Sequence, residues 1–110
     1  MWMYRFDFAT DACDGALGAP HGIDVAYTFG LPDHTALSGG RPERHQVAAV
    51  TSGAWAAFAR TGSPQTDALP AWPAYDTTTR ATMLFDADPI VAADPDGEER
   101  RAWDGIDVGR

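Results

Sequence analysis

The sequence predicts an α/β fold in which strands and helices alternate along one unit of 110 residues. Residues 2–8 alternate aromatic with other side chains, which is the pattern of a strand. Residues 42–62 carry apolar side chains at helical spacing, and residues 94–103 begin with the spacing of a helix cap. Residues 82–86 lie between these helices as a short strand. We therefore expect a core strand, a loop, a helix, a short edge strand and a terminal helix.

The first strand is the clearest element of the sequence. Trp2, Tyr4, Phe6 and Phe8 occupy every second position, which places four aromatic rings on one face. Residues 9–20 follow as a loop of small residues, rich enough in glycine to bring the backbone close to another part of the molecule.

The segment between this loop and the long helix has weaker signals. Residues 25–29 are expected to form a short extended or single-turn segment. A surface linker is expected to follow and to run to about Pro42.

The helix at residues 42–62 has signals at both ends. Pro42 suits the first turn, and Gly62 lies just past the last turn, after Arg60. Gly53 costs a helix about 1 kcal/mol relative to alanine, so either the helix is weak there or something packs tightly on that spot. The apolar residues at helical spacing are Val47, Val50, Ala54, Trp55 and Phe58.

The C-terminal third begins with a proline-rich connection at residues 63–75. The strand at residues 82–86 has a length that suits the edge of a sheet. In the final helix, Asp96 and Glu99 have the spacing of a capping box. The chain has no internal repeat or domain boundary, so it counts as one unit.

The charge of the chain argues against two classes of partner. The net charge is −8, from 16 acidic and 8 basic residues, and nucleic acids and anionic membranes both require clustered positive charge. No apolar run approaches the roughly 18 residues of a membrane helix. The first eight residues lack the continuous apolar stretch of a signal peptide, so a cytoplasmic location is the default expectation, although a displaced start could have removed such a signal.

Cysteine usage narrows the chemistry further. Cys13 is the one cysteine in the sequence. An intrachain disulfide and a zinc site built on cysteines are therefore both excluded.

His21 is the candidate for catalytic chemistry, because histidine titrates near neutral pH. It stands in G-A-P-H-G, after the strand and the glycine-rich loop. In serine hydrolases the base presents its imidazole to the serine hydroxyl while a carboxylate holds the other ring nitrogen, so a loop at the end of a strand is a suitable mount. A lone loop histidine is more often solvated than catalytic, so the surrounding motifs decide.

Five motifs occur in order and cover most of the chain. They are Y-R-F-D-F at 4–8, G-A-P-H-G-I-D-V at 18–25, F-G at 29–30, W-A-A-F-A-R-T-G-S-P at 55–64 and W-P-A-Y at 72–75. In this order they resemble the C-terminal portion of the type B carboxylesterases, the α/β-hydrolase family that includes bacterial carboxylesterases and the cholinesterases. The ordered set is far more specific than any single motif.

The resemblance implies a C-terminal fragment of an α/β-hydrolase fold, with residues 1–110 as an incomplete part of a carboxylesterase type B domain. It implies that His21 is the triad histidine, which activates the serine and then protonates the leaving alkoxide. Asp24 falls where the family often has glutamate in H-G-x-E, and is expected to support the site or the local structure and not to be the triad carboxylate. The complete enzyme would hydrolyse small carboxylic esters, with no cofactor and no metal.

The rest of the catalytic machinery is missing from the sequence. It contains no G-x-S-x-G motif and no Gly-Gly-rich loop of the oxyanion-hole type. Ser38 and Ser63 lie in turn-like sequence and Ser52 lies in a helix, so none is expected to be a nucleophile. We therefore expect the chain alone to be inactive and weakly folded, and the DNA upstream of the Met1 codon to encode the rest of such an enzyme.

Two alternatives remain open at this point. A metal site of His21 and Asp24 with Asp33 or His34 has suitable ligand types, but its spacing matches no short ligand motif. The chain could instead be a small acidic interaction module, whose aromatic strand docks onto a partner. That partner could be the missing N-terminal hydrolase portion, supplied as a second chain.

The remaining large aromatic residues have two readings as well. They could line a ligand-binding box, but helical spacing and the resemblance favour core positions. The residues concerned are Trp55, Phe58, Trp72 and Trp103.

Overall fold

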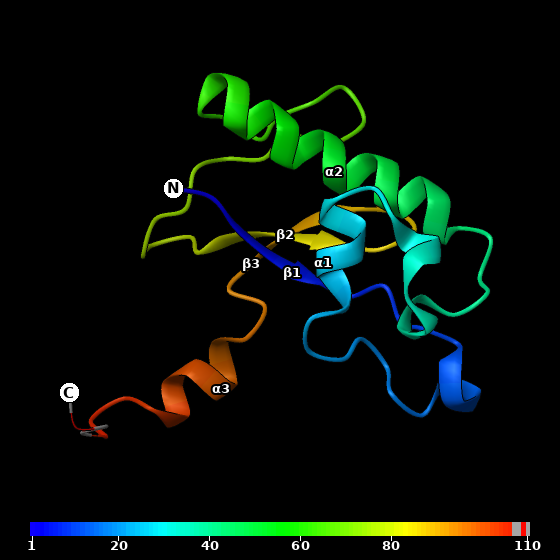
Figure 1. The fold of residues 1–110 in the computed structure, drawn as a ribbon. Coiled ribbons are helices and arrows are strands. Elements are labelled where there is room, and N and C mark those ends of the chain that lie inside the picture. Colours follow the sequence, from blue (N-terminus) through cyan, green and yellow to red (C-terminus); the bar gives the residue numbers. More distant parts are fainter. Residues whose placement is uncertain (107–108, 110) are drawn as a thin grey trace.

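A computed structural model describes residues 1–106 and 109, and it shows a small mixed sheet flanked by helices (Figure 1). The strands are β1 (Met3–Phe6), β2 (Ala81–Phe85) and β3 (Ile90–Ala93). The α-helices are α1 (Ile23–Thr28), α2 (Arg44–Thr61) and α3 (Gly97–Ala102). Short 3-10 helices are η1 (Ala12–Gly15), η2 (Pro32–His34) and η3 (Ala36–Ser38). The predicted α/β class is confirmed.

The sheet has the strand order β1-β2-β3. β1 runs parallel to β2, with Tyr4 beside Met83, and β3 runs antiparallel to β2, with Val91 beside Met83. The prediction that residues 82–86 form an edge strand was wrong, because β3 covers the second side of β2. β3 was not foreseen, since its four residues show no polar alternation. Among the described residues, β1 is paired on one side.

The aromatic face of β1 is confirmed and builds the core. The Tyr4 ring meets the Phe85 ring edge-on, with centroids 5.4 Å apart, and the Phe6 ring packs on Tyr27 at 4.8 Å. Burial of such rings is the main favourable term in folding. The two clusters of buried residues are Phe8, Ile23, Tyr27, Val47 and Ala48 around α1, and Ala54, Leu69, Trp72, Met83 and Phe85 between α2 and the sheet.

The segment after the histidine loop is more ordered than the sequence indicated. Where an extended or single-turn segment was expected, α1 forms a six-residue helix with Tyr27 fully buried. The prediction of a surface linker up to Pro42 was wrong in part, because η2 and η3 fold this segment into compact turns. Pro32 and Ser38 are buried there.

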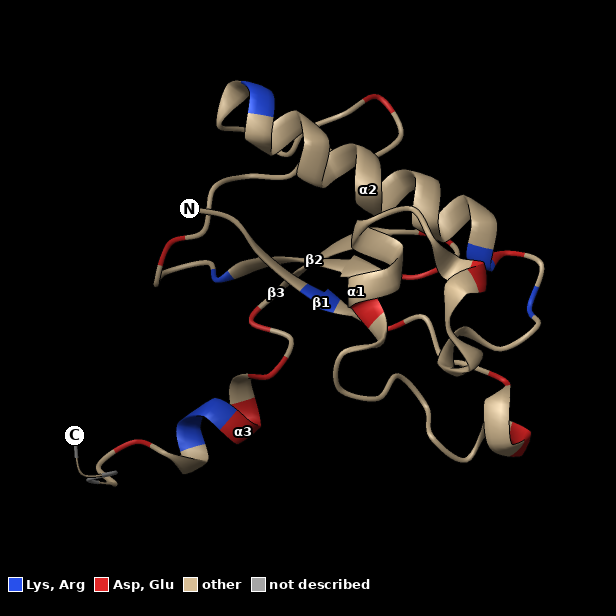
Figure 2. Cartoon of the chain, in the orientation of Figure 1, with Lys and Arg blue, Asp and Glu red and all other residues tan. Residues whose placement is uncertain are grey.

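α2 is continuous and ends as predicted. Gly62 adopts a φ of +78°, and its N–H donates to the Phe58 carbonyl at 2.8 Å, as in a left-handed C-cap. A Cβ atom built on Gly53 would meet no atom within 4 Å, so nothing in the described chain packs tightly there. The charged side chains of α2 are Arg44 and Arg60, one near each end (Figure 2).

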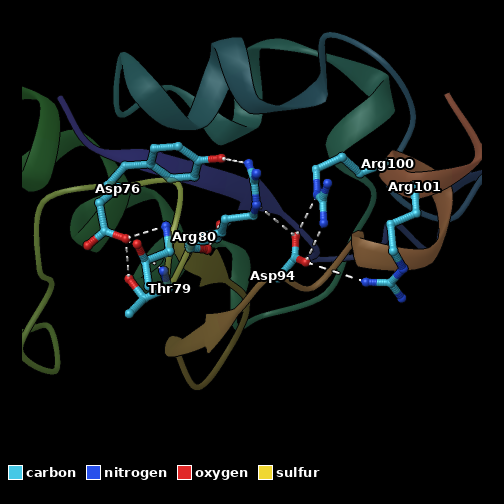
Figure 3. A network of polar contacts seen from close by, with 9 residues as sticks. Asp76, Thr79, Arg80, Asp94, Arg100 and Arg101 are labelled. Carbon is cyan, nitrogen blue, oxygen red and sulfur yellow. Dashed lines mark hydrogen bonds and ion pairs between the residues drawn. The ribbon is translucent and has the colours of Figure 1, made fainter. Parts of the chain in front are cut away.

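An ion-pair cluster joins the end of β3 to α3 (Figure 3). The carboxylate of Asp94 pairs with Arg100 at 3.1 Å, with Arg101 at 3.8 Å and with Arg80 at 3.9 Å. The hydrogen bond from Arg100 lowers the pKa of Asp94. α3 is therefore held to the sheet mainly by charge.

The N-terminus of α3 corrects one prediction. Asp96 occupies the cap position, but its side chain forms no capping hydrogen bond. It pairs instead with Arg5 of β1. The capping box of Asp96 and Glu99 is thus absent from this helix, because a full positive charge attracts the carboxylate more strongly than a backbone N–H does.

The chain is less compact than an independent domain of its size. Trp72 is buried as predicted, but the core positions predicted for Trp55, Phe58 and Trp103 were wrong, since these side chains are 45%, 47% and 64% exposed. The accessible surface is 6885 Å², against about 5,900 Å² for a compact protein of this mass. The radius of gyration is 15.1 Å, against about 13 Å for a compact chain of this length. Within residues 1–106, the face of α2 that carries Trp55 and Phe58 is left uncovered.

Candidate active site

His21 lies in a tight turn between the glycine-rich loop and α1. The N–H of Ile23 donates to the Pro20 carbonyl at 3.2 Å, which closes the turn around the histidine. Gly22 has a φ of +81°, a conformation that favours glycine and that lets α1 begin at the next residue. His21 is exposed, and its ring forms no hydrogen bond or ion pair within residues 1–106 and 109. Both ring nitrogens are therefore open to external groups.

The loop that leads to His21 leaves the sheet at the carboxyl end of β1. The N–H of Thr10 donates to the Gly18 carbonyl at 2.9 Å, which brings the two ends of this loop together. Cys13 and Asp14 adopt φ values of +53° and +56°, which are uncommon for residues with a side chain. In open α/β sheets, ligands bind outside the carboxyl ends of the strands, so the loop lies where a site is expected.

Asp24 is the second residue of α1 and faces the sheet. It accepts a hydrogen bond of 2.8 Å from the Tyr4 hydroxyl of β1. Burial, assisted by the neighbouring Asp24 carboxylate, raises the pKa of Tyr4 to about 12. The phenol is therefore a neutral donor at physiological pH. No sequence signal pointed to this pair, because alternation places Tyr4 on a face and does not reveal what its hydroxyl contacts.

The three serines of the chain do not assemble with His21. Ser38 is fully buried in η3. Ser52 lies within α2 and donates to the Ala49 carbonyl at 3.3 Å. The Ser63 hydroxyl accepts from the N–H of Gln65 at 3.4 Å, in the turn after α2. None of them shows the pairing with a base that activates a serine hydroxyl.

The metal-ligating residue types are dispersed. Within the described part of the chain, no group of three His, Cys, Asp or Glu side chains is placed to hold a metal ion. The carboxylate of Asp33 is engaged by Arg44 at 2.8 Å and lies 3.6 Å from the His45 ring. None of the described helices is both long and apolar enough to cross a membrane.

An open apolar surface lies beside the Tyr4 and Asp24 pair. A hollow of about 850 Å³ lies along the facing sides of α1 and α2. A second hollow of about 310 Å³ continues from it over the N-terminal end of β1. The rings of Tyr4 and Trp55, with centroids 6.2 Å apart, belong to both hollows. The exposed apolar side chains along this surface are Met1, Val25, Phe29, Trp55 and Phe58.

Comparison with known sequences agrees with the resemblance that the motifs of this chain indicated. The sequence model described as the carboxylesterase family matches residues 1–103. The para-nitrobenzyl esterase of Bacillus subtilis is 34% identical over 104 residues, which cover 92% of this chain and 21% of that protein. The phenmedipham hydrolase of Pseudarthrobacter oxydans is 38% identical over 89 residues, which cover 74% of this chain and 17% of that protein. The chain spans about a fifth of the length of these relatives.

Solved structures agree with the sequence comparison. A para-nitrobenzyl esterase superposes with a TM-score of 0.79 at 33% identity, over 91% of this chain and 21% of its own. A carboxylesterase of Geobacillus stearothermophilus superposes with a TM-score of 0.75 at 40% identity, over 93% of this chain and 21% of its own. An esterase of Clostridium hathewayi, at 20% identity and a TM-score of 0.83 over 94% of this chain and 20% of its own, shows the fold alone. The predicted fragment of an α/β-hydrolase fold is confirmed.

Proposed function

Because this chain belongs to the carboxylesterase family, we propose that it forms the C-terminal part of a serine carboxylesterase domain and supplies the triad histidine, His21. The nucleophilic serine, the acid and the oxyanion hole would come from the remaining part of such an enzyme. The complete protein would hydrolyse small carboxylic esters without a cofactor. Asp24 would support the histidine turn and would not serve as the triad carboxylate.

One observation carries this proposal. The His21 ring is exposed in a turn that is closed by backbone hydrogen bonds, on the loop after the carboxyl end of β1. The other two histidines are placed differently. His34 ends a 3-10 helix, and His45 lies in the first turn of α2 near the Asp33 carboxylate. A general base needs a fixed backbone position together with a free ring nitrogen, and His21 has both.

In the proposed role, His21 would act in two half-reactions, which are acylation of the serine and hydrolysis of the acyl-serine. His21 would accept the serine hydroxyl proton while the serine oxygen forms a bond to the ester carbonyl carbon. The same proton would then pass to the alkoxide oxygen as the carbon to alkoxide bond breaks, which leaves an acyl-serine. A water molecule would repeat the sequence, giving the carboxylic acid and the free serine.

A chimeric enzyme tests this role. This chain would replace the matching C-terminal fifth of the Bacillus subtilis para-nitrobenzyl esterase, and hydrolysis of a short activated ester would be measured. We expect His21→Ala to lower kcat at least 1,000-fold, because loss of a triad member removes most of the catalytic power. His34→Ala is the matched control and should keep activity within twofold. A His21→Ala chimera with unchanged kcat would refute the proposed role.

A second role of the chain, as a docking partner of the N-terminal hydrolase portion, is favoured by the surface of α2. This helix of 18 residues carries charged side chains only near its two ends (Figure 2). A helix that lacks a charged outer face is usually buried on that side too. Trp55 and Phe58 are nearly half exposed, and β1 has an unpaired edge among the described residues. We propose that the preceding portion of a carboxylesterase covers this surface.

Binding to a separately produced N-terminal portion of the same esterase tests the docking role. Ala56 lies on the open surface of α2, and Ala68 is exposed in the connection that follows this helix. We expect Ala56→Arg to weaken binding at least tenfold, because it places a charge in an apolar contact. Ala68→Arg adds the same charge elsewhere and should leave the Kd within twofold. Equal binding by both variants would show that this surface of α2 is not the docking site.

A further inference from the structure

The turn that carries His21 leads directly into α1, and α1 is too short to be stable without tertiary contacts. The N–H of Val25 donates to the Gly22 carbonyl at 3.3 Å, so the first turn of the helix follows the histidine directly. A helix of six residues is unstable in isolation and depends on tertiary contacts for its structure. The position of the His21 backbone therefore depends on whatever fixes the start of α1, two residues later.

Two kinds of contact fix α1 to the rest of the chain. The first is apolar packing, in which Ile23 and Tyr27 are buried and the Tyr27 ring lies 5.9 Å from the Phe8 ring. Such packing is strong, but it is not directional. The second is the hydrogen bond of 2.8 Å from the Tyr4 hydroxyl to Asp24, three residues after His21. This bond specifies both a distance and an angle between the sheet and the first turn of α1.

The donor side of this bond is rigid. The Tyr4 ring is held edge-on by Phe85 at 5.4 Å and by Trp55 at 6.2 Å, so its position follows from the sheet and from α2. Its backbone is paired with β2, beside Met83. A rotation of the start of α1 would break this hydrogen bond, so the bond restrains the orientation of the first turn in addition to the buried Ile23 side chain.

We propose that Tyr4 is a positioning residue for His21, because its hydroxyl holds Asp24 and so sets the orientation of the turn that presents the imidazole. This inference rests on the proposed catalytic role of His21. It assigns Tyr4 no contact with the ester and no proton transfer. It predicts that loss of one hydroxyl group impairs kcat and leaves KM nearly unchanged, since the binding surfaces stay in place.

The experiment uses the chimeric enzyme with this chain in full. Tyr4→Phe removes the hydroxyl but keeps the ring, and Tyr75→Phe is the matched control. The Tyr75 hydroxyl accepts from Arg80 at 3.0 Å, without a contact to α1. We expect Tyr4→Phe to lower kcat about tenfold or more, because small misplacements of a catalytic group are costly. KM should stay within twofold, and Tyr75→Phe should match the unaltered chimera in both constants.

Variants of Asp24 separate hydrogen bonding from charge. An asparagine oxygen can still accept the Tyr4 proton, so Asp24→Asn should keep kcat within about threefold. Asp24→Ala cannot accept this proton and should lose as much kcat as Tyr4→Phe. In the double variant Tyr4→Phe with Asp24→Ala, the second change should add little, because both single changes remove the same bond. Losses that add up independently would contradict the proposal.

A second measurement tests the effect of Tyr4 on the turn without relying on catalysis. Amide hydrogen exchange of residues 22–28, followed by mass spectrometry, should rise at least tenfold in Tyr4→Phe and stay unchanged in Tyr75→Phe. If His21→Ala abolishes activity while Tyr4→Phe changes neither kcat nor this exchange, the positioning role is wrong and the proposed function stands. If His21→Ala keeps full activity, the proposed function is wrong, and the exchange data alone decide whether Tyr4 orders the turn.

Discussion

The carboxylate of Asp11 accepts a hydrogen bond of 2.6 Å from the backbone N–H of Gly40, joining two loops that are 29 residues apart in sequence. The bond holds the glycine-rich loop against the turn that precedes α2. Gly39 makes this approach possible. Its φ of +68° and ψ of −158° lie in a region that is essentially restricted to glycine. A side chain there would also overlap the Asp11 carboxylate.

Replacement of Gly39 should therefore be costly. We expect Gly39→Ala to lower the free energy of unfolding by about 2 to 3 kcal/mol, from backbone strain and the displaced Asp11 side chain. Urea denaturation of the chimeric enzyme, followed by circular dichroism, measures this change against the unaltered chimera. A loss below about 0.5 kcal/mol would show that the two loops are not packed as described.

Gly53 should behave in the opposite way. It lies in the middle of α2 with helical geometry and with open space where a Cβ atom would be placed. Gly53→Ala should raise the free energy of unfolding of the chain by about 0.5 to 1 kcal/mol, because alanine is the better helix former. The shift in the urea midpoint of the chain alone checks the sign. A destabilising effect in the chain alone would mean that some group packs against this position.

The open surface of α2 should make the isolated chain bind hydrophobic dyes and unfold over a broad temperature range. Trp55→Gln should reduce the fluorescence of a bound apolar dye by about half or more, since this side chain belongs to both hollows. Trp103→Gln is the matched control, because Trp103 is exposed next to α3 and lines neither hollow. Equal effects of both changes, or a sharp reversible transition without dye binding, would contradict this account of the surface.

The attachment of α3 should depend on pH through Asp94. The hydrogen bond from Arg100 lowers the pKa of Asp94 below its unfolded value, which is about 4. A lowered pKa stabilises the folded chain at pH values above 4, and this contribution is lost as the pH falls through the folded pKa. Amide exchange of α3 should therefore be faster in Asp94→Asn than in the unaltered chain at pH 6, and the difference should shrink below pH 3.

Asp88 provides the control for this prediction. It is exposed in the turn between β2 and β3 and takes part in no ion pair that involves residues 1–106. Asp88→Asn makes the same change in charge and should leave the exchange of α3 unaltered at both pH values. If Asp94→Asn also has no effect, the helix is held by other contacts.

Much of the fold was predictable, because the strongest patterns report on burial. The alternation of Trp2, Tyr4, Phe6 and Phe8 describes a face that the core does cover. Pro42 and Gly62 bracket α2 within two residues, since their backbone preferences act locally. β3 was not predicted, because the sequence of a short apolar strand cannot be distinguished from that of an apolar connection.

The errors have two physical origins. Trp55 and Phe58 have the spacing of core residues, but nothing in the described chain covers them. The predictions of an edge position for β2 and of a capping role for Asp96 were wrong for another reason. In both cases a distant partner decides the outcome, β3 for the strand and Arg5 for the carboxylate. The catalytic role of His21 stays a prediction, supported by motifs and by the geometry of its turn.

Ester hydrolysis by three samples tests the central claim most directly: this chain alone, the N-terminal portion of the Bacillus subtilis para-nitrobenzyl esterase alone, and their mixture. We expect turnover of a short activated ester only in the mixture, because the serine and the histidine of the triad lie on different chains. A mixture prepared with the His21→Ala chain should fall to the background rate. Two results would contradict the account: turnover by this chain alone that disappears in His21→Ala, or a mixture whose activity is unaffected by that change.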